Sequence, residues 1–253
     1  MKTIILGPPG TGKTTTLLDL VDEFIQQGVR PKQIGYFSFT KKAATEAANR
    51  AAEKFGLDIE NDLSNFRTLH SLAFRNLGMT KEKMMKIEDY KEFGQKCGIP
   101  IKTANYSSED GTFNSDNEYL TIINTARVKR LDLLEYYDSR KNILDIERST
   151  LFLLAEELQK FKKEKGLKDF TDLLEDFIEK SIPSSLEVLF IDEAQDLSLI
   201  QWEMVRHLWK HAKKTYIAGD DDQAIFKWAG ADVDHFIALK EEVNDIKILD
   251  QSY

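Results

Sequence analysis

The sequence predicts an α/β fold: a parallel sheet flanked by helices and interrupted by a mainly helical insertion. Short apolar runs alternate with segments of helical periodicity near both ends of the 253-residue chain. This alternation is typical of a parallel sheet, because consecutive parallel strands need a long crossover, which is usually a helix. Between the two regions, residues 72–167 carry mostly helical periodicity. One domain with an inserted helical part explains this order most simply.

The N-terminal region predicts two strand–helix pairs. The first strand, residues 3–6, is an apolar run that leads into a loop rich in glycine and proline. The helix after this loop has one apolar face: Leu17, Leu20, Val21, Phe24 and Ile25. The second strand, residues 34–39, leads into a helix with a face of mostly small residues: Ala44, Ala47, Ala48, Ala51 and Phe55. Small side chains on that face allow close packing on the sheet.

The C-terminal region returns to the same alternation. Apolar runs predict strands at residues 187–191, 215–218 and 246–249, with a helix from about residue 199 to residue 211. Within the helical part, a polar stretch at 106–117 predicts turns.

The domain boundaries follow from these changes of periodicity. We predict an α/β domain made of residues 1–71 and 166–253, and a helical insertion made of residues 72–165. A chain of this length suits one large or two modest domains, at about 150 residues per domain.

Composition excludes several classes of protein. Hydrophobic residues make up 42% of the chain and charged residues 31%, which excludes a disordered or collagen-like chain. The formal net charge of −8 argues against a protein that coats nucleic acid or membrane with positive charge. A local basic groove is compatible with this charge.

Metal clusters and targeting segments are not expected. Cys97 is the single cysteine, so it forms no internal disulfide. His207 and His211 are four residues apart, but no glutamate lies between them and no third ligand is evident, so a surface or packing pair is favoured over zinc. The apolar N-terminal stretch is too short for a signal peptide, and no run approaches ~18 apolar residues. We expect a cytoplasmic protein with no membrane partner.

Residues 7–14, Gly-Pro-Pro-Gly-Thr-Gly-Lys-Thr, match the P-loop signature between a predicted strand and a predicted helix. Glycines allow successive backbone N–H groups to surround phosphate oxygens, and the helix N-terminus adds partial positive charge. Lys13 can bridge the β- and γ-phosphates, and the Thr14 hydroxyl can bind Mg²⁺. The predicted nucleotide-binding residues are Gly7, Pro8, Pro9, Gly10, Thr11, Gly12, Lys13, Thr14 and Thr15.

A second motif ends the strand at 187–191 with two carboxylates, Asp192 and Glu193. A strand that places Asp192 beside the P-loop supplies a second magnesium contact, and Glu193 is then placed to polarise an attacking water. Idle acidic residues at a strand end are the alternative. After a complete P-loop, the pair favours hydrolysis of a nucleoside triphosphate.

A third polar segment, residues 219–223, also follows an apolar strand. Its Gln223 could reach a γ-phosphate and detect its loss, whereas the segment taken alone is more typical of an acidic loop capped by an amide.

Taken together in this order, seven segments resemble the N-terminal half of UvrD-like superfamily 1 helicases, the UvrD/Rep/PcrA group. The matching segments are residues 7–14, 38–44, 66–71, 168–174, 191–196, 219–231 and 249–253. The resemblance implies a RecA-like ATP-binding domain with a helical insertion, ATP and Mg²⁺ as cofactors, and a C-terminal motor domain as partner. A monomer is expected.

The same resemblance implies roles for particular residues. Lys13, Glu193 and Gln223 would be catalytic, Thr14 and Asp192 would bind the metal, and Gln195 and Tyr253 would contact the nucleotide. The implied contacts with single-stranded DNA (or a partial duplex) are Phe39, Thr40, Thr68, His70, Phe226 and Trp228. Aromatic faces stack on any base, which suits a motor that ignores sequence.

On spacing alone, purely structural roles for these residues remain open. Phe39, Phe226 and Trp228 are as compatible with a hydrophobic core as with a DNA path. The basic residues at 127–130 and 160–168 are typical of solvated helix faces, with a DNA contact as the less favoured interpretation.

The chain departs from the family in three places. Only two residues precede the first strand, where the family has a segment with a glutamine that recognises adenine. Ala229 stands where family members usually have arginine. Tyr253 ends the chain in the middle of a family motif. We therefore expect a truncated helicase that binds Mg-nucleotide, hydrolyses it slowly and does not unwind duplex alone. The alternatives are a stand-alone nucleotide-dependent single-strand binder or switch and, less favoured, a small-molecule kinase.

Overall fold

The fold is described from a computed structural model that covers residues 1–253 except 108–109, 144–145, 181–184, 221–230 and 250–253. Its centre is a parallel sheet of six strands in the order β3-β2-β6-β7-β1-β8. These strands are β1 (Lys2–Leu6), β2 (Ile34–Ser38), β3 (Phe66–Arg67), β6 (Val188–Asp192), β7 (Lys214–Gly219) and β8 (Asp245–Ile248). The α/β prediction is confirmed.

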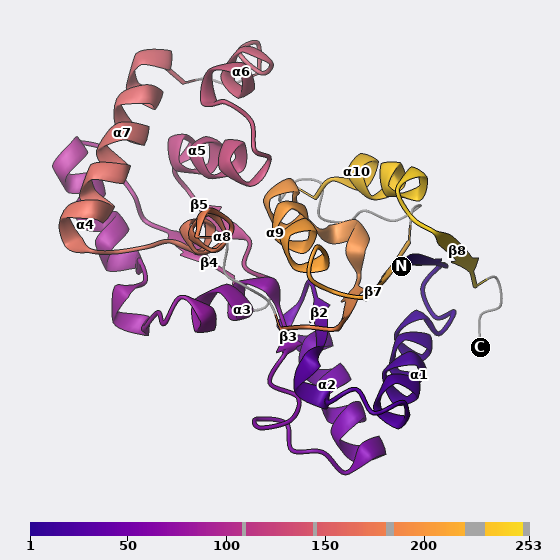
Figure 1. Ribbon diagram of the computed structural model, residues 1–253. Helices are drawn as coiled ribbons and strands as arrows, with labels where there is room; N and C mark the ends of the chain where they lie inside the picture. Colours follow the sequence, from indigo (N-terminus) through magenta and orange to yellow (C-terminus); the bar gives the residue numbers. More distant parts are fainter. Residues whose placement is uncertain (108–109, 144–145, 181–184, 221–230, 250–253) are drawn as a thin grey trace.

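Helices cover both faces of this sheet (Figure 1). One face packs on α1 (Lys13–Gln26) and α2 (Lys41–Phe55) through a core that includes Leu17, Val21 and Ala47. The other face packs on α3 (Leu69–Asn76), α8 (Phe170–Glu179), α9 (Leu199–Trp209) and α10 (Val233–Ala238). The small face of α2 is buried as its alanine spacing predicts.

Local signals explain where the flanking helices begin and end. The hydroxyl of Thr40 accepts a hydrogen bond from the backbone N–H of Ala43 and so caps the N-terminus of α2. Gly56 ends α2 with a φ of 67°, a left-handed conformation that glycine adopts without strain. Short 3₁₀ turns lie at Pro31–Gln33, Lys81–Lys83, Ala194–Asp196 and Leu239–Glu241.

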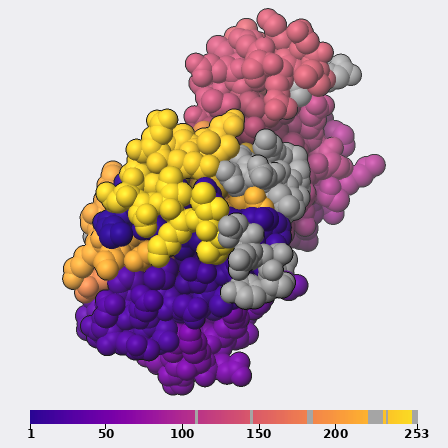
Figure 2. Space-filling model, turned by 90° about the vertical axis from the view of Figure 1, so that its right-hand side faces the viewer, coloured from indigo at the N-terminus to yellow at the C-terminus, as the bar shows by residue number. Residues whose placement is uncertain are grey.

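The insertion forms a separate lobe with its own core (Figures 1 and 2). Its helices are α4 (Ile87–Cys97), α5 (Glu118–Val128), α6 (Leu133–Asp138) and α7 (Arg148–Lys165). The polar stretch predicted as turns, residues 106–117, overlaps a two-stranded antiparallel hairpin of β4 (Ala104–Tyr106) and β5 (Phe113–Ser115). The prediction missed it because each strand is only three residues long, too short to show a periodic pattern. The exact boundaries at residues 72 and 165 stay predictions.

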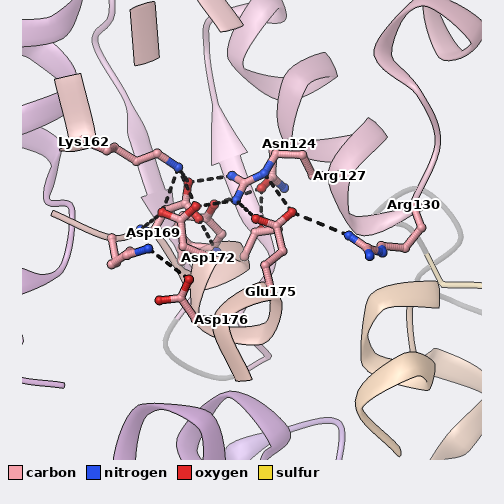
Figure 3. A network of polar contacts seen from close by, with 11 residues as sticks. Asn124, Arg127, Arg130, Lys162, Asp169, Asp172, Glu175 and Asp176 are labelled. Carbon is pink, nitrogen blue, oxygen red and sulfur yellow. Dashed lines mark hydrogen bonds and ion pairs between the residues drawn. The ribbon is translucent and has the colours of Figure 1, made fainter. Parts of the chain in front are cut away.

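A buried ionic network joins the lobe to α8 (Figure 3). Arg127 of α5 donates to Asp169 (2.8 Å), Asp172 (2.6 Å) and Glu175 (2.7 Å). Lys162 of α7 donates to Asp169 at 2.7 Å and Asp172 at 2.8 Å. The prediction of solvated basic faces is therefore wrong for Arg127 and Lys162, because the acidic partners that bury them lie in a different helix.

No helix within the described ranges has the length and apolar character needed to cross a membrane.

Candidate nucleotide site and nucleic-acid cleft

The predicted P-loop lies at the carboxyl end of β1 and opens into α1. Gly10 and Gly12 have φ values of 80° and 83°, a left-handed backbone that strains other residues. A Cβ at Gly7 would lie 2.5 Å from Thr11 Oγ1 and 2.8 Å from the carbonyl oxygen of Leu249, so no side chain fits there. The loop is thus a tight backbone cradle, as phosphate binding requires.

Lys13 turns its ammonium into this cradle. Its side chain is buried, and Nζ donates to the carbonyl oxygens of Gly7 at 2.6 Å and Pro8 at 3.1 Å. Neutral carbonyls leave the charge of this buried cation uncompensated, and phosphate oxygens bind an ammonium more strongly. Lys13 therefore fits the phosphate-binding role that the motif predicts.

Thr14 and Asp192 meet although 178 residues separate them in the sequence. The Thr14 hydroxyl donates to Asp192 Oδ2 at 2.9 Å, because α1 begins beside the carboxyl end of β6. A hydroxyl and a carboxylate are the oxygen ligands that Mg²⁺ prefers. The two residues predicted to bind metal therefore form a donor set that fits this ion.

Burial is the largest effect on Asp192, and it raises the pKa of this carboxyl; hydrogen bonds from Tyr36 and Thr14 oppose the rise. Asp192 Oδ1 also accepts the backbone N–H of Glu193 at 3.0 Å. None of these hydrogen bonds comes from a cationic group. A bound cation would therefore stabilise the ionised form of this buried carboxyl.

Glu193 and Gln195 lie in the turn after β6. Glu193 has a φ of 53°, a left-handed conformation that is uncommon outside glycine and marks a constrained position. Gln195 Nε2 donates to Glu193 Oε2 at 2.7 Å, and Gln195 Oε1 accepts the backbone N–H of Asp220 at 3.0 Å. The amide therefore connects the ends of β6 and β7, next to the predicted water-polarising residue.

The remaining nucleotide predictions divide into two groups. Thr15 is exposed at the first turn of α1, and its hydroxyl accepts from Arg50 Nη2 at 3.1 Å. Gln223 and Tyr253 lie outside the described residues.

The predicted DNA residues Thr40 and Thr68 occupy equivalent places after β2 and β3. Thr68 caps α3 by accepting the N–H of Ser71 at 3.2 Å, just as Thr40 caps α2. A cleft of about 540 Å³ adjoins Thr68. Its other lining residues include Lys41, Arg67, His70, Ser71 and Phe170.

His70 and Phe39 are less open than their predicted role suggests. Burial lowers the pKa of His70 to about 4, although the charge of Asp110 opposes this, so the ring is neutral at pH 7. A Cβ on Gly111, in the β4–β5 loop, would lie 2.8 Å from the His70 ring, which shows how closely this loop covers it. Phe39 is only 5% exposed, so stacking on a base would require its neighbours to move. Phe226 and Trp228 lie outside the described residues.

Sequence reasoning missed two residues at these sites. Arg67 lines the cleft with a buried Nε that has no hydrogen-bond partner in the described part of the chain, and burial lowers its pKa. Its place directly before Thr68, at the end of a strand, was the available signal. Tyr36 donates to Asp192 Oδ2 at 2.6 Å, and within an apolar strand run it gave no signal.

The parallel sheet, the P-loop at the carboxyl end of β1 and the carboxylate of β6 define a P-loop nucleotide-binding domain of the RecA-like α/β class. The sequence profile of the UvrD/REP helicase N-terminal domain matches residues 1–244, and the chain belongs to this family.

Several curated proteins are similar over nearly the whole chain. A probable DNA helicase II homolog of Mycoplasma pneumoniae is 26% identical over 94% of the chain. The ATP-dependent DNA helicase Rep of Escherichia coli is 26% identical over 99% of it, and the ATP-dependent DNA helicase PcrA of Leuconostoc citreum is 25% identical over 99%. The chain spans only 35% to 38% of the length of these relatives.

Proposed function

We propose that this chain binds ATP with Mg²⁺ and is the first motor domain of an ATP-dependent DNA helicase or translocase that moves along single-stranded DNA. The observation that carries the nucleotide part is the 2.9 Å hydrogen bond between Thr14 and Asp192. It joins the P-loop to the carboxylate motif, which is the pairing that a Mg-nucleotide site needs.

Each residue of the site has a distinct task in this proposal. Lys13 would exchange its carbonyl partners for phosphate oxygens, and Thr14 and Asp192 would hold the metal. Bound Mg²⁺ would neutralise phosphate charge and orient the phosphates for attack. Glu193 orients the attacking water, and Gln195 carries the change at the phosphates toward the end of β7.

The nucleic-acid part rests on the cleft beside Thr68 and on the names of the relatives. Arg67 and Lys41 line this cleft, so phosphates could bind there despite the negative net charge of the chain. Thr40, Thr68 and His70 would hold phosphates, while Phe39, Phe226 and Trp228 would face bases. The C-terminal motor domain of the whole protein would supply the opposite wall and further catalytic charge, and the protein would work as a cytoplasmic monomer.

Nucleotide binding is tested with a fluorescent ATP analogue, with and without Mg²⁺. Wild type should bind more tightly with Mg²⁺, and Lys13→Ala should lose at least tenfold in affinity, because one charge-assisted phosphate contact is worth about 1.5–3 kcal/mol. Lys54→Ala, which removes an exposed lysine paired with Asp19, is the matched control and should bind normally. Equal binding by Lys13→Ala and wild type would refute the site.

Coupling to DNA is tested by ATP turnover with and without single-stranded DNA, on this chain and on the full-length protein. The chain alone should turn over slowly, because an arginine from a second domain can be worth about 10³–10⁵ in rate. Turnover of the full-length protein should rise with DNA. Filter binding of Trp228→Ala then tests base stacking: affinity equal to wild type would remove Trp228 from the DNA path.

A further inference from the structure

Four aromatic rings form a ladder across the sheet, on the face that α1 and α2 cover. Phe66 of β3 stacks on Tyr36 of β2, with ring centroids 5.3 Å apart and planes at 11°. Tyr36 stacks on Phe190 of β6 (6.2 Å, 26°), and Phe190 stacks on Tyr216 of β7 (5.3 Å, 14°). Because Tyr36 is completely buried between two rings, the direction of its hydroxyl is fixed.

That hydroxyl points at the predicted metal carboxylate. Tyr36 pairs with Phe190 in the register of β2 and β6, and Asp192 lies two residues further along the same strand, so both side chains are on one face. Tyr36 Oη donates to Asp192 Oδ2 at 2.6 Å, and Thr14 Oγ1 donates to the same oxygen.

Ring packing alone does not explain why residue 36 carries a hydroxyl. Phe66 and Phe190 occupy neighbouring places in the ladder without a hydroxyl, so a phenylalanine at position 36 would also stack. The hydroxyl must be paired once it is buried, and the bond to Asp192 satisfies it. The result is a donor that a rigid part of the sheet holds against the carboxylate.

We propose that Tyr36 is a positioning residue for the metal site: its hydroxyl fixes the orientation of the Asp192 carboxylate and thereby strengthens Mg²⁺ binding with nucleotide. This inference rests on the proposed function, since it assumes Mg-nucleotide at the P-loop. Thr14 would turn its oxygen to the metal, and the bond from Tyr36 would then be the side-chain donor that keeps Asp192 in place. Hydrogen-bond partners of metal ligands are commonly worth 10–100-fold in metal affinity.

The test compares Tyr36→Phe with Tyr216→Phe, which removes a hydroxyl from the same ladder. Among the described residues, Asp192 accepts side-chain hydrogen bonds from Thr14 and Tyr36 and not from Tyr216. Affinity for a fluorescent ATP analogue is measured in EDTA and over a series of Mg²⁺ concentrations. In Tyr36→Phe the gain in affinity from Mg²⁺ should shrink by about tenfold, with binding in EDTA unchanged. Tyr216→Phe should behave as wild type.

The outcomes separate the two proposals. If Mg²⁺ does not tighten binding by wild type, the proposed metal site fails, whatever Tyr36 does. If wild type responds and folded Tyr36→Phe keeps the full gain, or weakens equally in EDTA and Mg²⁺, the positioning role is refuted. Thermal unfolding reports whether the variant is folded.

A second measurement uses wild type alone, so it holds even where Tyr36→Phe fails to fold. With ¹³C-labelled tyrosine rings, adding Mg²⁺ and ADP should shift the Cζ resonance of Tyr36 beyond the shift seen with ADP in EDTA. The Cζ resonance of Tyr216 should move less. An unchanged Tyr36 resonance would overturn the proposal.

Discussion

Replacing Lys162 by methionine tests the ionic network that joins the helical lobe to α8. Lys162 is 3% exposed, and its ammonium contacts Asp169 and Asp172 at 2.7 and 2.8 Å. The two carboxylates also form the capping box of α8, where each accepts a backbone N–H of the other residue. Methionine keeps most of the buried apolar stem and removes the charge together with its hydrogen bonds to the two carboxylates.

The expected loss of stability is about 3–5 kcal/mol, the usual cost of removing one partner from a buried ion pair. Arg127 remains, but it is then the one cation paired with Asp169 and Asp172 among the described ion pairs, and it also pairs with Glu175. At ~2–4 °C per kcal/mol for a chain of this size, the unfolding midpoint should fall by roughly 6–20 °C.

Lys160→Met is the matched control, because Lys160 lies on the same helix and also pairs with a carboxylate. It bonds Glu157 at 2.8 Å but is 57% exposed. An exposed pair contributes little to stability, so this variant should unfold close to wild type. Circular dichroism on heating, at pH 7, measures both.

The pH dependence of the unfolding free energy gives a second test of the network. Burial and the charge of Asp169 raise the pKa of Asp172, although Arg127 and Lys162 oppose the rise. A raised folded pKa means that ionised Asp172 costs stability at neutral pH and that the cost disappears as pH falls through that pKa. Without Lys162, ionised Asp172 costs more stability. The difference in unfolding free energy between Lys162→Met and wild type should therefore become smaller from pH 7 to pH 4. If the two proteins differ by less than about 1 kcal/mol in unfolding free energy at pH 7, or if the difference does not change with pH, this account of the network is refuted.

Two further predictions concern the sites. The folded pKa of His70, about 4, lies below its ordinary 6.5, so wild type should lose up to ~3 kcal/mol of stability between pH 6.5 and 4 as the unfolded state gains a proton. His70→Asn should lack this pH dependence. If the unfolding free energies of wild type and His70→Asn, measured in urea, change with pH in parallel, the prediction is contradicted. Gly12→Ala and Gly166→Ala both force alanine into a left-handed backbone, at φ values of 83° and 65°, and each should cost about 1–2 kcal/mol. Only Gly12→Ala should also lose nucleotide affinity; unimpaired binding of a fluorescent ATP analogue would count against the cradle.

The sequence predicted the strand–helix alternation because apolar runs and helical faces are local patterns. It also predicted where a nucleotide would bind, because the P-loop is contiguous and the strand before Asp192 is strongly apolar. In the structure the side chains of Thr14 and Asp192 form a hydrogen bond. The β4–β5 hairpin was not predicted, because its three-residue strands are too short to show a periodic pattern and are held by contacts within the lobe.

By itself the sequence determined the α/β class and predicted the helical insertion and the residues proposed to bind phosphate and metal, because each of these is a pattern of neighbouring residues. Only the tertiary structure decided what the polar residues outside the motifs contact. Arg127 and Lys162 belong to basic segments typical of exposed helix faces, yet the structure buries Lys162 and leaves only 14% of the Arg127 side chain exposed. Tyr36 belongs to an apolar strand, yet its hydroxyl contacts Asp192. Such pairs join segments far apart in the chain, so their energies depend on burial and distance, which no local pattern contains.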